Sequence, residues 1–286
     1  MARCDVCFRH CEIKEGSFGF CGVRTCREGI IYPDNYGKIT SLALDPIWKK
    51  PLRRFFPGSM ILSVGSYGCN LRCPFCQNYQ ISWSDEVNLI KKAARYISPS
   101  KLALLAQSQI ENGNIGVAFT YNEPLISYEY ILDTAKILEQ NDLKTVVVTN
   151  GMADASTMKE LFLHVHAMNI DLKGFTDHYY EDILKGNRQM VMDFIKEAVK
   201  HFHVELTTLI IPDENDSDEE IYNLSKWISM LEDENGERIG QSIPLHLSRF
   251  FPRFHMTQKD ATNVEKVYHL KQIANKNLQY VYTGNC

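Results

Sequence analysis

From Met60 onward, short apolar runs alternate with amphipathic helical patterns, and no other feature restricts the fold as strongly. The runs that we predict to be strands cover residues 60–66, 115–120, 144–149, 166–173, 203–211, 243–250 and 278–283. Residues 128–140 and 217–232 have apolar side chains at helical spacing, and Ser217 with Glu220 forms a capping-box pattern. Strands separated by helices form parallel sheets through right-handed crossovers. The alternation predicts an α/β fold, a partial or full (β/α) barrel whose chemistry lies at the carboxyl ends of the strands, with a doubly wound open sheet as the alternative.

Composition and charge set the remaining limits on organisation. The chain has 286 residues, of which 44% are hydrophobic and 23% charged, so it can bury a substantial core. A net charge of −4 gives no electrostatic reason to expect a nucleic-acid or membrane partner. Because the first part is rich in cysteine and glycine and has little periodicity, we expect a small irregular metal-binding segment over 1–58, followed by a barrel domain over 59–286. The charged run at 49–54 is interpreted as a solvated loop, with a phosphate-binding or protein-docking role as the alternative.

The nine cysteines are clustered, with five in residues 4–26, three in residues 69–76, and one at the last position. The first residues have no apolar core of a secretory signal, and no apolar run approaches the roughly 18 residues that a membrane span needs. We therefore expect a reduced, cytoplasmic protein in which clustered cysteines ligate metals rather than form disulfides.

The central cluster directly follows the first predicted barrel strand as CxxxCxxC, with Cys69, Cys73 and Cys76. Three thiolates can each bind one iron of a 4Fe–4S cluster, which leaves the fourth iron without a protein ligand. The amino and carboxylate groups of S-adenosylmethionine (SAM) suit that open iron, and reductive cleavage would then yield a 5′-deoxyadenosyl radical. A zinc site with three cysteines and a histidine is the alternative that spacing alone allows. Phe75, the aromatic residue before the last cysteine, favours the cluster.

This CxxxCx-aromatic-C motif resembles the signature of the radical SAM superfamily. The motifs that extend the likeness, in order along residues 56–252, are FPGSMILSVGSYGCNLRCPFCQN, FTYNEP, VVTNG, NIDLKG, LTTLIIPDENDS and PLHLSRFFP. The series resembles the pyruvate formate-lyase activating enzyme-like branch, and within it the AmmeMemoRadiSam group, whose members carry YNEP and an N-terminal cysteine segment. The resemblance implies a partial (β/α)6-type radical SAM barrel and an enzyme that cleaves SAM and abstracts a hydrogen atom from a substrate.

The resemblance also implies partners. An activating enzyme acts on a glycyl-radical partner protein and takes its electron from a flavodoxin- or ferredoxin-type donor. Modification of a different substrate, a peptide, a metabolite or an RNA base, in a Memo-associated system is the alternative. A metal-binding or electron-transfer protein without SAM chemistry is the third possibility, and the additional motifs count against it.

Roles in SAM binding are carried over from the resemblance to side chains at the strand ends, namely Phe75, Asn122, Glu123, Thr149, Asn150, Asp171, Lys173 and His246. Glu123 suits the SAM ammonium, although an acid before Pro124 is also typical of a helix start. Lys173 suits the SAM carboxylate, although it can equally pair with Asp171. His246 is interpreted either as a group near the ribose or methionine carboxylate or as a structural residue.

The N-terminal cysteines Cys4, Cys7, Cys11 and Cys21 follow the pattern CxxCx3Cx9C. Four thiolates in an irregular, glycine-rich segment suit a zinc ion, and a second iron–sulfur cluster that passes electrons to the first is the alternative. Unligated or disulfide-bonded cysteines are the remaining possibility. The pattern assigns no role to Cys26 or Cys286.

Overall fold

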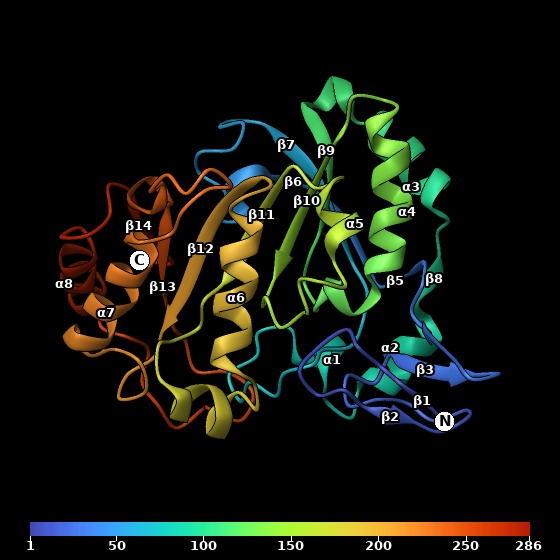
Figure 1. Ribbon diagram of the computed structural model, residues 1–286, viewed down its shortest axis with the longest axis horizontal. Helices are drawn as coiled ribbons and strands as arrows, with labels where there is room; N and C mark the ends of the chain where they lie inside the picture. The colour runs from blue at the N-terminus through green and yellow to red at the C-terminus, as the bar shows by residue number, and fades with distance from the viewer.

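A computed structural model describes residues 1–286 and places a curved eight-stranded sheet at its centre (Figure 1). The strand order is β14-β13-β12-β11-β10-β9-β7-β6, and neighbours pair in parallel except β6 with β7. The strands are β6 (Ser41–Pro46), β7 (Met60–Gly65), β9 (Asn114–Phe119), β10 (Lys144–Thr149), β11 (Ala167–Asp171), β12 (His203–Ile210), β13 (Leu245–Arg249) and β14 (Val281–Gly284). The edge strands β6 and β14 do not pair with each other, so the sheet is an open, partial barrel. This confirms the predicted fold class.

Helices connect the parallel strands, and the longer ones cover the outside of the sheet (Figure 1). They are α1 (Tyr79–Ser82), α2 (Val87–Ala93), α3 (Pro99–Gln107), α4 (Tyr128–Glu139), α5 (Lys159–Phe162), α6 (Arg188–Ala198), α7 (Asp218–Ser229) and α8 (Val264–Ala274), with short turns η1 (Ile47–Lys49), η2 (Ile110–Asn112), η3 (Pro124–Ser127), η4 (Tyr179–Ile183) and η5 (Gly240–Ser242). At α7 the Ser217 hydroxyl accepts a hydrogen bond from the Glu220 N–H. The Glu220 carboxylate instead accepts from the Phe175 N–H at 2.6 Å, so the capping box is only half formed.

The amino-terminal half of the barrel interior is filled by the segment that joins β6 to β7. Ile47, Leu52 and Phe55 of this segment are buried against the inner side chains of the strands. Among those, Val146 of β10 lies one pleat below Val148, which faces the open, carboxyl-terminal half of the barrel. The apolar segment therefore leaves only the carboxyl ends of the strands free to form a cavity.

The cysteine-rich N-terminus forms small two-stranded sheets and lies beside α1 and α2 at the carboxyl-terminal end of the barrel (Figure 1). Its strands are β1 (Ala2–Arg3), β2 (Glu12–Ile13), β3 (Arg24–Arg27), β4 (Ile30–Pro33) and β5 (Lys38–Ile39), the last paired with β8 (Arg95–Tyr96). It is joined to the loop after β10, where the Asp154 N–H donates to the Val6 carbonyl at 2.8 Å. The domain boundary between residues 58 and 59 stays a prediction. β6, which precedes this boundary, pairs with β7 in the barrel sheet. None of the helices has the length and apolar character needed to cross a membrane.

Candidate active site

A cavity of about 440 Å³ opens at the carboxyl ends of the strands, where the fold predicts the chemistry. The loop after β7 contributes Cys69, Cys73 and Cys76, and all three thiols are free and line this cavity. Burial raises the pKa of the Cys73 thiol to about 12, and the pKa values of the other two are also raised by burial. Phe75, which is 4% exposed, lines the cavity between them. The structure thus brings the three predicted ligands and the aromatic residue together.

The cysteine loop is attached to the loop after β9 through the side chain of Asn122. Its Oδ1 accepts from the Ser66 N–H at 3.0 Å, and its Nδ2 donates to the carbonyls of Tyr67 and Gly68 at 3.1 and 3.2 Å. The amide therefore holds the start of the loop in place. Asn122 also lines the cavity, and its predicted contact with SAM stays a prediction.

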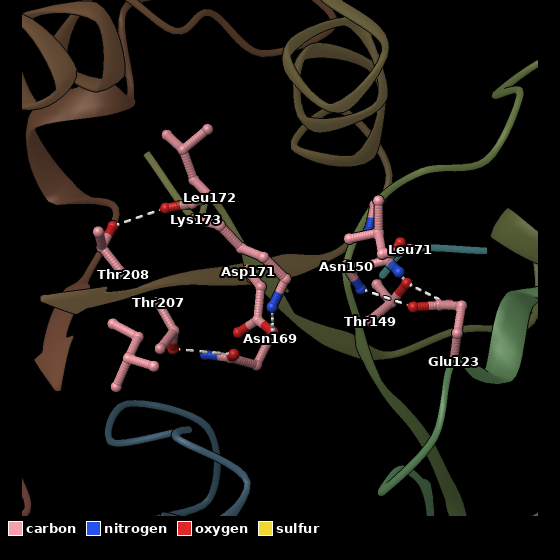
Figure 2. A network of polar contacts seen from close by, with 12 residues as sticks. Leu71, Glu123, Thr149, Asn150, Asn169, Asp171, Leu172, Lys173, Thr207 and Thr208 are labelled. Carbon is pink, nitrogen blue, oxygen red and sulfur yellow. Dashed lines mark hydrogen bonds and ion pairs between the residues drawn. The ribbon is translucent and has the colours of Figure 1, made fainter. Parts of the chain in front are cut away.

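Glu123 is buried at the cavity wall with both carboxylate oxygens engaged. Oε1 accepts from the Thr149 hydroxyl at 2.6 Å, and Oε2 accepts from the Asn150 N–H at 2.8 Å (Figure 2). Oε1 also accepts from the Leu125 N–H at 3.0 Å. Burial raises the pKa of Glu123 to about 7, although these three hydrogen bonds oppose that rise. Because Glu123 also caps η3, its two interpretations are compatible: it begins a helical turn and lies at the cavity wall.

Asn150 connects the end of β10 to the cysteine loop. Its Nδ2 lies 3.7 Å from the Cys69 sulfur and donates to Asn70 Oδ1 at 3.0 Å. Its Oδ1 accepts from the Met152 N–H at 2.8 Å, so the side chain is fixed from both ends. An N–H that faces a ligating sulfur stabilises the thiolate and tunes a cluster.

Asp171 is the last residue of β11 and Lys173 lies two positions further on; the two form an ion pair at the cavity, with 2.7 Å between Lys173 Nζ and Asp171 Oδ2 (Figure 2). Burial alone would lower the pKa of Lys173, but the adjacent Asp171 carboxylate raises it above its usual value. The lysine is therefore a permanent cation. The ammonium has three donor positions, of which this pair uses one, so the ion-pair interpretation leaves Lys173 able to bind an anion.

His246 lies on β13 but does not line the cavity; Ser248, one pleat nearer the carboxyl end, does. His246 Nε2 is 2.6 Å from Glu205 Oε2, and the pair is buried inside the barrel. Burial would raise the pKa of Glu205, but hydrogen bonds from His203, His246 and the backbone lower it to about 2. These contacts agree with the interpretation of His246 as a structural residue. Its place near the SAM ribose or carboxylate stays a prediction.

Sequence reasoning missed a cationic group at the cavity. The run at 49–54 was expected to be a solvated loop, and for Lys50 this expectation is wrong: Lys50 is 3% exposed and lines the cavity. Its Nζ lies 2.9 Å from Asp45 Oδ2, which also accepts from the Tyr121 hydroxyl at 2.9 Å. Burial would raise the pKa of Asp45, but Lys50 and Tyr121 lower it to about 2. The apolar residues on either side, Ile47 and Leu52, were the available signal that this run enters the barrel.

The donor set fits an iron–sulfur cluster better than the zinc alternative. No histidine lines the cavity, so a site of three cysteines and one histidine cannot form there. Three thiols at the edge of an open cavity, with a buried carboxylate and a lysine on the opposite strands, match a cluster with one open iron and a ligand that carries an amine and a carboxylate.

A partial parallel barrel with this cysteine loop defines an enzyme that uses a three-cysteine cluster at the carboxyl ends of its strands. The chain belongs to the radical SAM superfamily, whose sequence model matches residues 63–225. Membership implies a 4Fe–4S cluster and SAM as cofactors, and the chain is a radical SAM enzyme.

The chain is also similar to individual proteins. The chain is 38% identical over 287 residues to an uncharacterized protein of Methanocaldococcus jannaschii, covering 99% of this chain and 81% of that protein. It is 26% identical over 187 residues to the pyruvate formate-lyase-activating enzyme of Clostridium pasteurianum, covering 63% of this chain and 72% of that enzyme. Its fold is similar to Streptococcus suis SuiB bound to S-adenosylmethionine, with a TM-score of 0.57, 14% identity, and coverage of 79% of this chain and 52% of that one. The proteins to which this chain is similar in sequence thus include an activating enzyme.

Proposed function

We propose that this enzyme abstracts a hydrogen atom from a backbone glycine of a partner protein and so acts as a glycyl-radical activating enzyme. The size of the cavity is the observation that supports this most directly. A volume of about 440 Å³ is filled largely by one cofactor-sized molecule. The reacting part of the substrate must therefore be narrow, and a glycine in an extended loop, which has no side chain, is the narrowest peptide unit. The similarity to the pyruvate formate-lyase-activating enzyme agrees with this reaction.

Different residues of the chain would bind the cluster and the polar groups of SAM. Cys69, Cys73 and Cys76 would hold three irons of the cluster, which with SAM supplies the 5′-deoxyadenosyl radical upon one-electron reduction. Glu123, fixed by Thr149 and Asn150, would accept hydrogen bonds from the SAM amino group.

At the opposite wall, Lys173 would donate to the SAM carboxylate, while Asp171 keeps the ammonium directed into the cavity. The polar ends of the cofactor would thus be held from β9 on one side and β11 on the other, and the electron would come from a flavodoxin- or ferredoxin-type protein.

A second candidate function rests on Lys50. A buried ammonium at the cavity wall, together with the exposed Lys49 beside it, suits a small substrate with a negative charge. Modification of a peptide, metabolite or RNA base in a Memo-associated system is therefore the alternative to glycine activation.

The proposal also includes a second metal group at the N-terminus. Cys4, Cys7, Cys11 and Cys21 line one small cavity of their own. A zinc ion and a second iron–sulfur cluster are the two groups that four thiolates hold most readily.

The test is anaerobic incubation of the reconstituted enzyme with SAM, dithionite and candidate partner proteins. Activation predicts 5′-deoxyadenosine together with a glycyl EPR doublet on the partner. Formation of 5′-deoxyadenosine without a doublet on any partner, but with a mass change in another substrate, would establish the alternative. The Lys173→Met variant should lose SAM binding. The matched variant Lys144→Met should retain it, because Lys144 lies at the amino end of β10, away from the cavity.

A further inference from the structure

Three consecutive carbonyl groups of the cysteine loop accept hydrogen bonds from arginine side chains. Arg72 Nη1 donates to the carbonyls of Cys69 and Leu71 at 3.0 and 2.8 Å. Arg9, which belongs to the N-terminal segment, donates from Nε to the Asn70 carbonyl between these two, at 3.2 Å. The N-terminal segment therefore takes a direct part in fixing the loop that carries the three cysteines.

The ring of Phe20 lies against both arginines. Its centre is 3.4 Å from the guanidinium carbon of Arg9 and 3.8 Å from that of Arg72. The Phe20 carbonyl also accepts from Arg72 Nη2. Contacts between a guanidinium and an aromatic ring are attractive, so the ring restricts both side chains. Arg9 Nη2 donates in addition to the Lys185 carbonyl, and Arg9 thus connects the N-terminal segment, the cysteine loop and the loop after η4.

The Asn70 carbonyl that Arg9 holds belongs to the same peptide group as the N–H of Leu71. That nitrogen lies 3.4 Å from the Cys69 sulfur, to which its N–H donates. Because a trans peptide is planar, with its oxygen and its hydrogen on opposite sides, a donor that fixes the oxygen also directs the hydrogen. Arg9 is therefore linked through one peptide group to the sulfur of a predicted iron ligand. A charged donor at one end of such a chain strengthens the next hydrogen bond by polarising it.

The positive charges of Arg9 and Arg72 are not neutralised by carboxylates. All of the hydrogen bonds that the two guanidinium groups make go to backbone carbonyls. Burial lowers the pKa of Arg9, and the groups that oppose this effect are cysteine thiols, Cys69 among them. A guanidinium stays charged at every physiological pH. Both arginines therefore keep a full positive charge beside the cysteine loop.

We propose that Arg9, together with Arg72, is a positioning residue that raises the reduction potential of the SAM cluster. Arg9 fixes the peptide group whose N–H faces the Cys69 sulfur, and both charges favour the additional electron of the reduced cluster. Net charge and hydrogen bonds to the sulfurs are established influences on such potentials. The inference rests on the cluster that the superfamily implies, and it depends neither on the substrate nor on the group that the N-terminal cysteines hold.

The test compares a neutral and a charged replacement at the same position. The reconstituted enzyme is titrated anaerobically with dithionite in the absence of SAM, and the midpoint potential is read from the EPR signal that SAM alters in a parallel sample. Arg9→Gln can still donate to the Asn70 carbonyl but has no charge. It should lower the equilibrium constant for one-electron reduction about tenfold, which corresponds to about 59 mV. Arg9→Lys keeps the charge and should change this constant less than threefold.

The matched control is Arg27→Gln, which changes the net charge of the protein by the same amount. Arg27 belongs to the same N-terminal segment and lies 6.0 Å from the centre of the Tyr32 ring, but it is exposed and does not contact the cysteine loop through a hydrogen bond. This variant should shift the equilibrium constant less than twofold. A tenfold shift here would mean that overall charge, and not the position of Arg9, sets the potential.

Two results for Arg9 would overturn the proposal. One is an unchanged potential in Arg9→Gln at wild-type iron content. The other is an equal loss in Arg9→Gln and Arg9→Lys, which would assign the effect to packing instead of charge. If Arg9→Gln does not retain its iron, Arg72→Gln and Arg72→Lys make the same comparison from within the cysteine loop, with the same expected shifts and the same contradicting results.

Discussion

The Glu123 carboxylate and the Thr149 hydroxyl lie 2.6 Å apart, and their hydrogen bond joins the loop that follows β9 to the last residue of the neighbouring strand β10. The Asn150 N–H reinforces the connection at 2.8 Å. Since Asn150 also faces Cys69, a single carboxylate sets the position of one wall of the cavity relative to the cluster loop.

Replacing Glu123 by Gln should weaken SAM binding at least tenfold and remove its pH dependence. The pKa of Glu123 is raised to about 7, so in the wild type the carboxylate ionises as the pH rises through that value, and SAM affinity should increase between about pH 6 and 7.5. Gln cannot ionise, so the affinity of the variant should be flat over this range. Calorimetric titration of the reconstituted enzyme measures both, with the exposed Glu111→Gln as control. A pH-dependent affinity in the variant would contradict this role.

Glu205 should stabilise the fold at neutral pH. Its pKa falls from 4.5 to about 2 on folding, so the stabilisation is fully present above pH 4.5 and is lost as the pH falls through about 2. The shift corresponds to about 3 kcal/mol, and Glu205→Gln should therefore lower the free energy of unfolding by roughly that amount at pH 7. Urea titrations at several pH values should show the difference shrinking towards pH 2; a constant difference would mean that packing, rather than charge, is responsible.

The sequence was sufficient to predict features that depend on local pattern. The strands at 60–66 and 144–149 and the helix at 128–140 match β7, β10 and α4 closely, because apolar periodicity records which face is buried. The cysteine loop was predictable because its three ligands lie within eight residues of one another, so that their spacing in the sequence is enough to bring them together.

What the sequence could not provide are contacts between distant segments. His246 meets Glu205, 41 positions earlier in the chain, and this pairing depends on the register of β12 with β13. Likewise, nothing in the pattern of charges shows that Lys50 is carried into the barrel by its apolar neighbours.

Gly68 should be the least replaceable glycine of the cluster loop. Its φ of +90° is unfavourable for other residues, and a Cβ there would lie 2.3 Å from the Val23 side chain and 2.9 Å from the Cys21 carbonyl. Gly68→Ala should destabilise the protein by more than about 2 kcal/mol and reduce cluster retention, because it separates the N-terminal segment from the loop. Gly22→Ala has a similar φ of +71° with nothing within 4 Å, so it isolates the backbone cost of about 1 kcal/mol. Thermal unfolding and iron analysis of the two variants provide the comparison, and equal effects would show that the contact with Val23 is unimportant.

Lys50 should matter far more than its neighbour Lys49, although both are lysines beside the same acid. Lys50 Nζ is buried 2.9 Å from Asp45, whereas Lys49 is half exposed at 3.8 Å. Lys50→Met would leave the Asp45 carboxylate buried with only the Tyr121 hydroxyl as a strong partner, which should cost about 1–3 kcal/mol and raise the pKa of Asp45 from about 2 towards its usual value. Lys49→Met should cost less than about 0.5 kcal/mol, because exposed ion pairs contribute little. Denaturant unfolding at pH 7 and at pH 3 distinguishes the two variants. The loss in free energy of unfolding caused by Lys50→Met should be smaller at pH 3, because Asp45 is protonated in that variant at this pH. Equal stability of the two variants at pH 7 would show that the buried ion pair is not needed to hold Tyr121 and the segment after β6 inside the barrel.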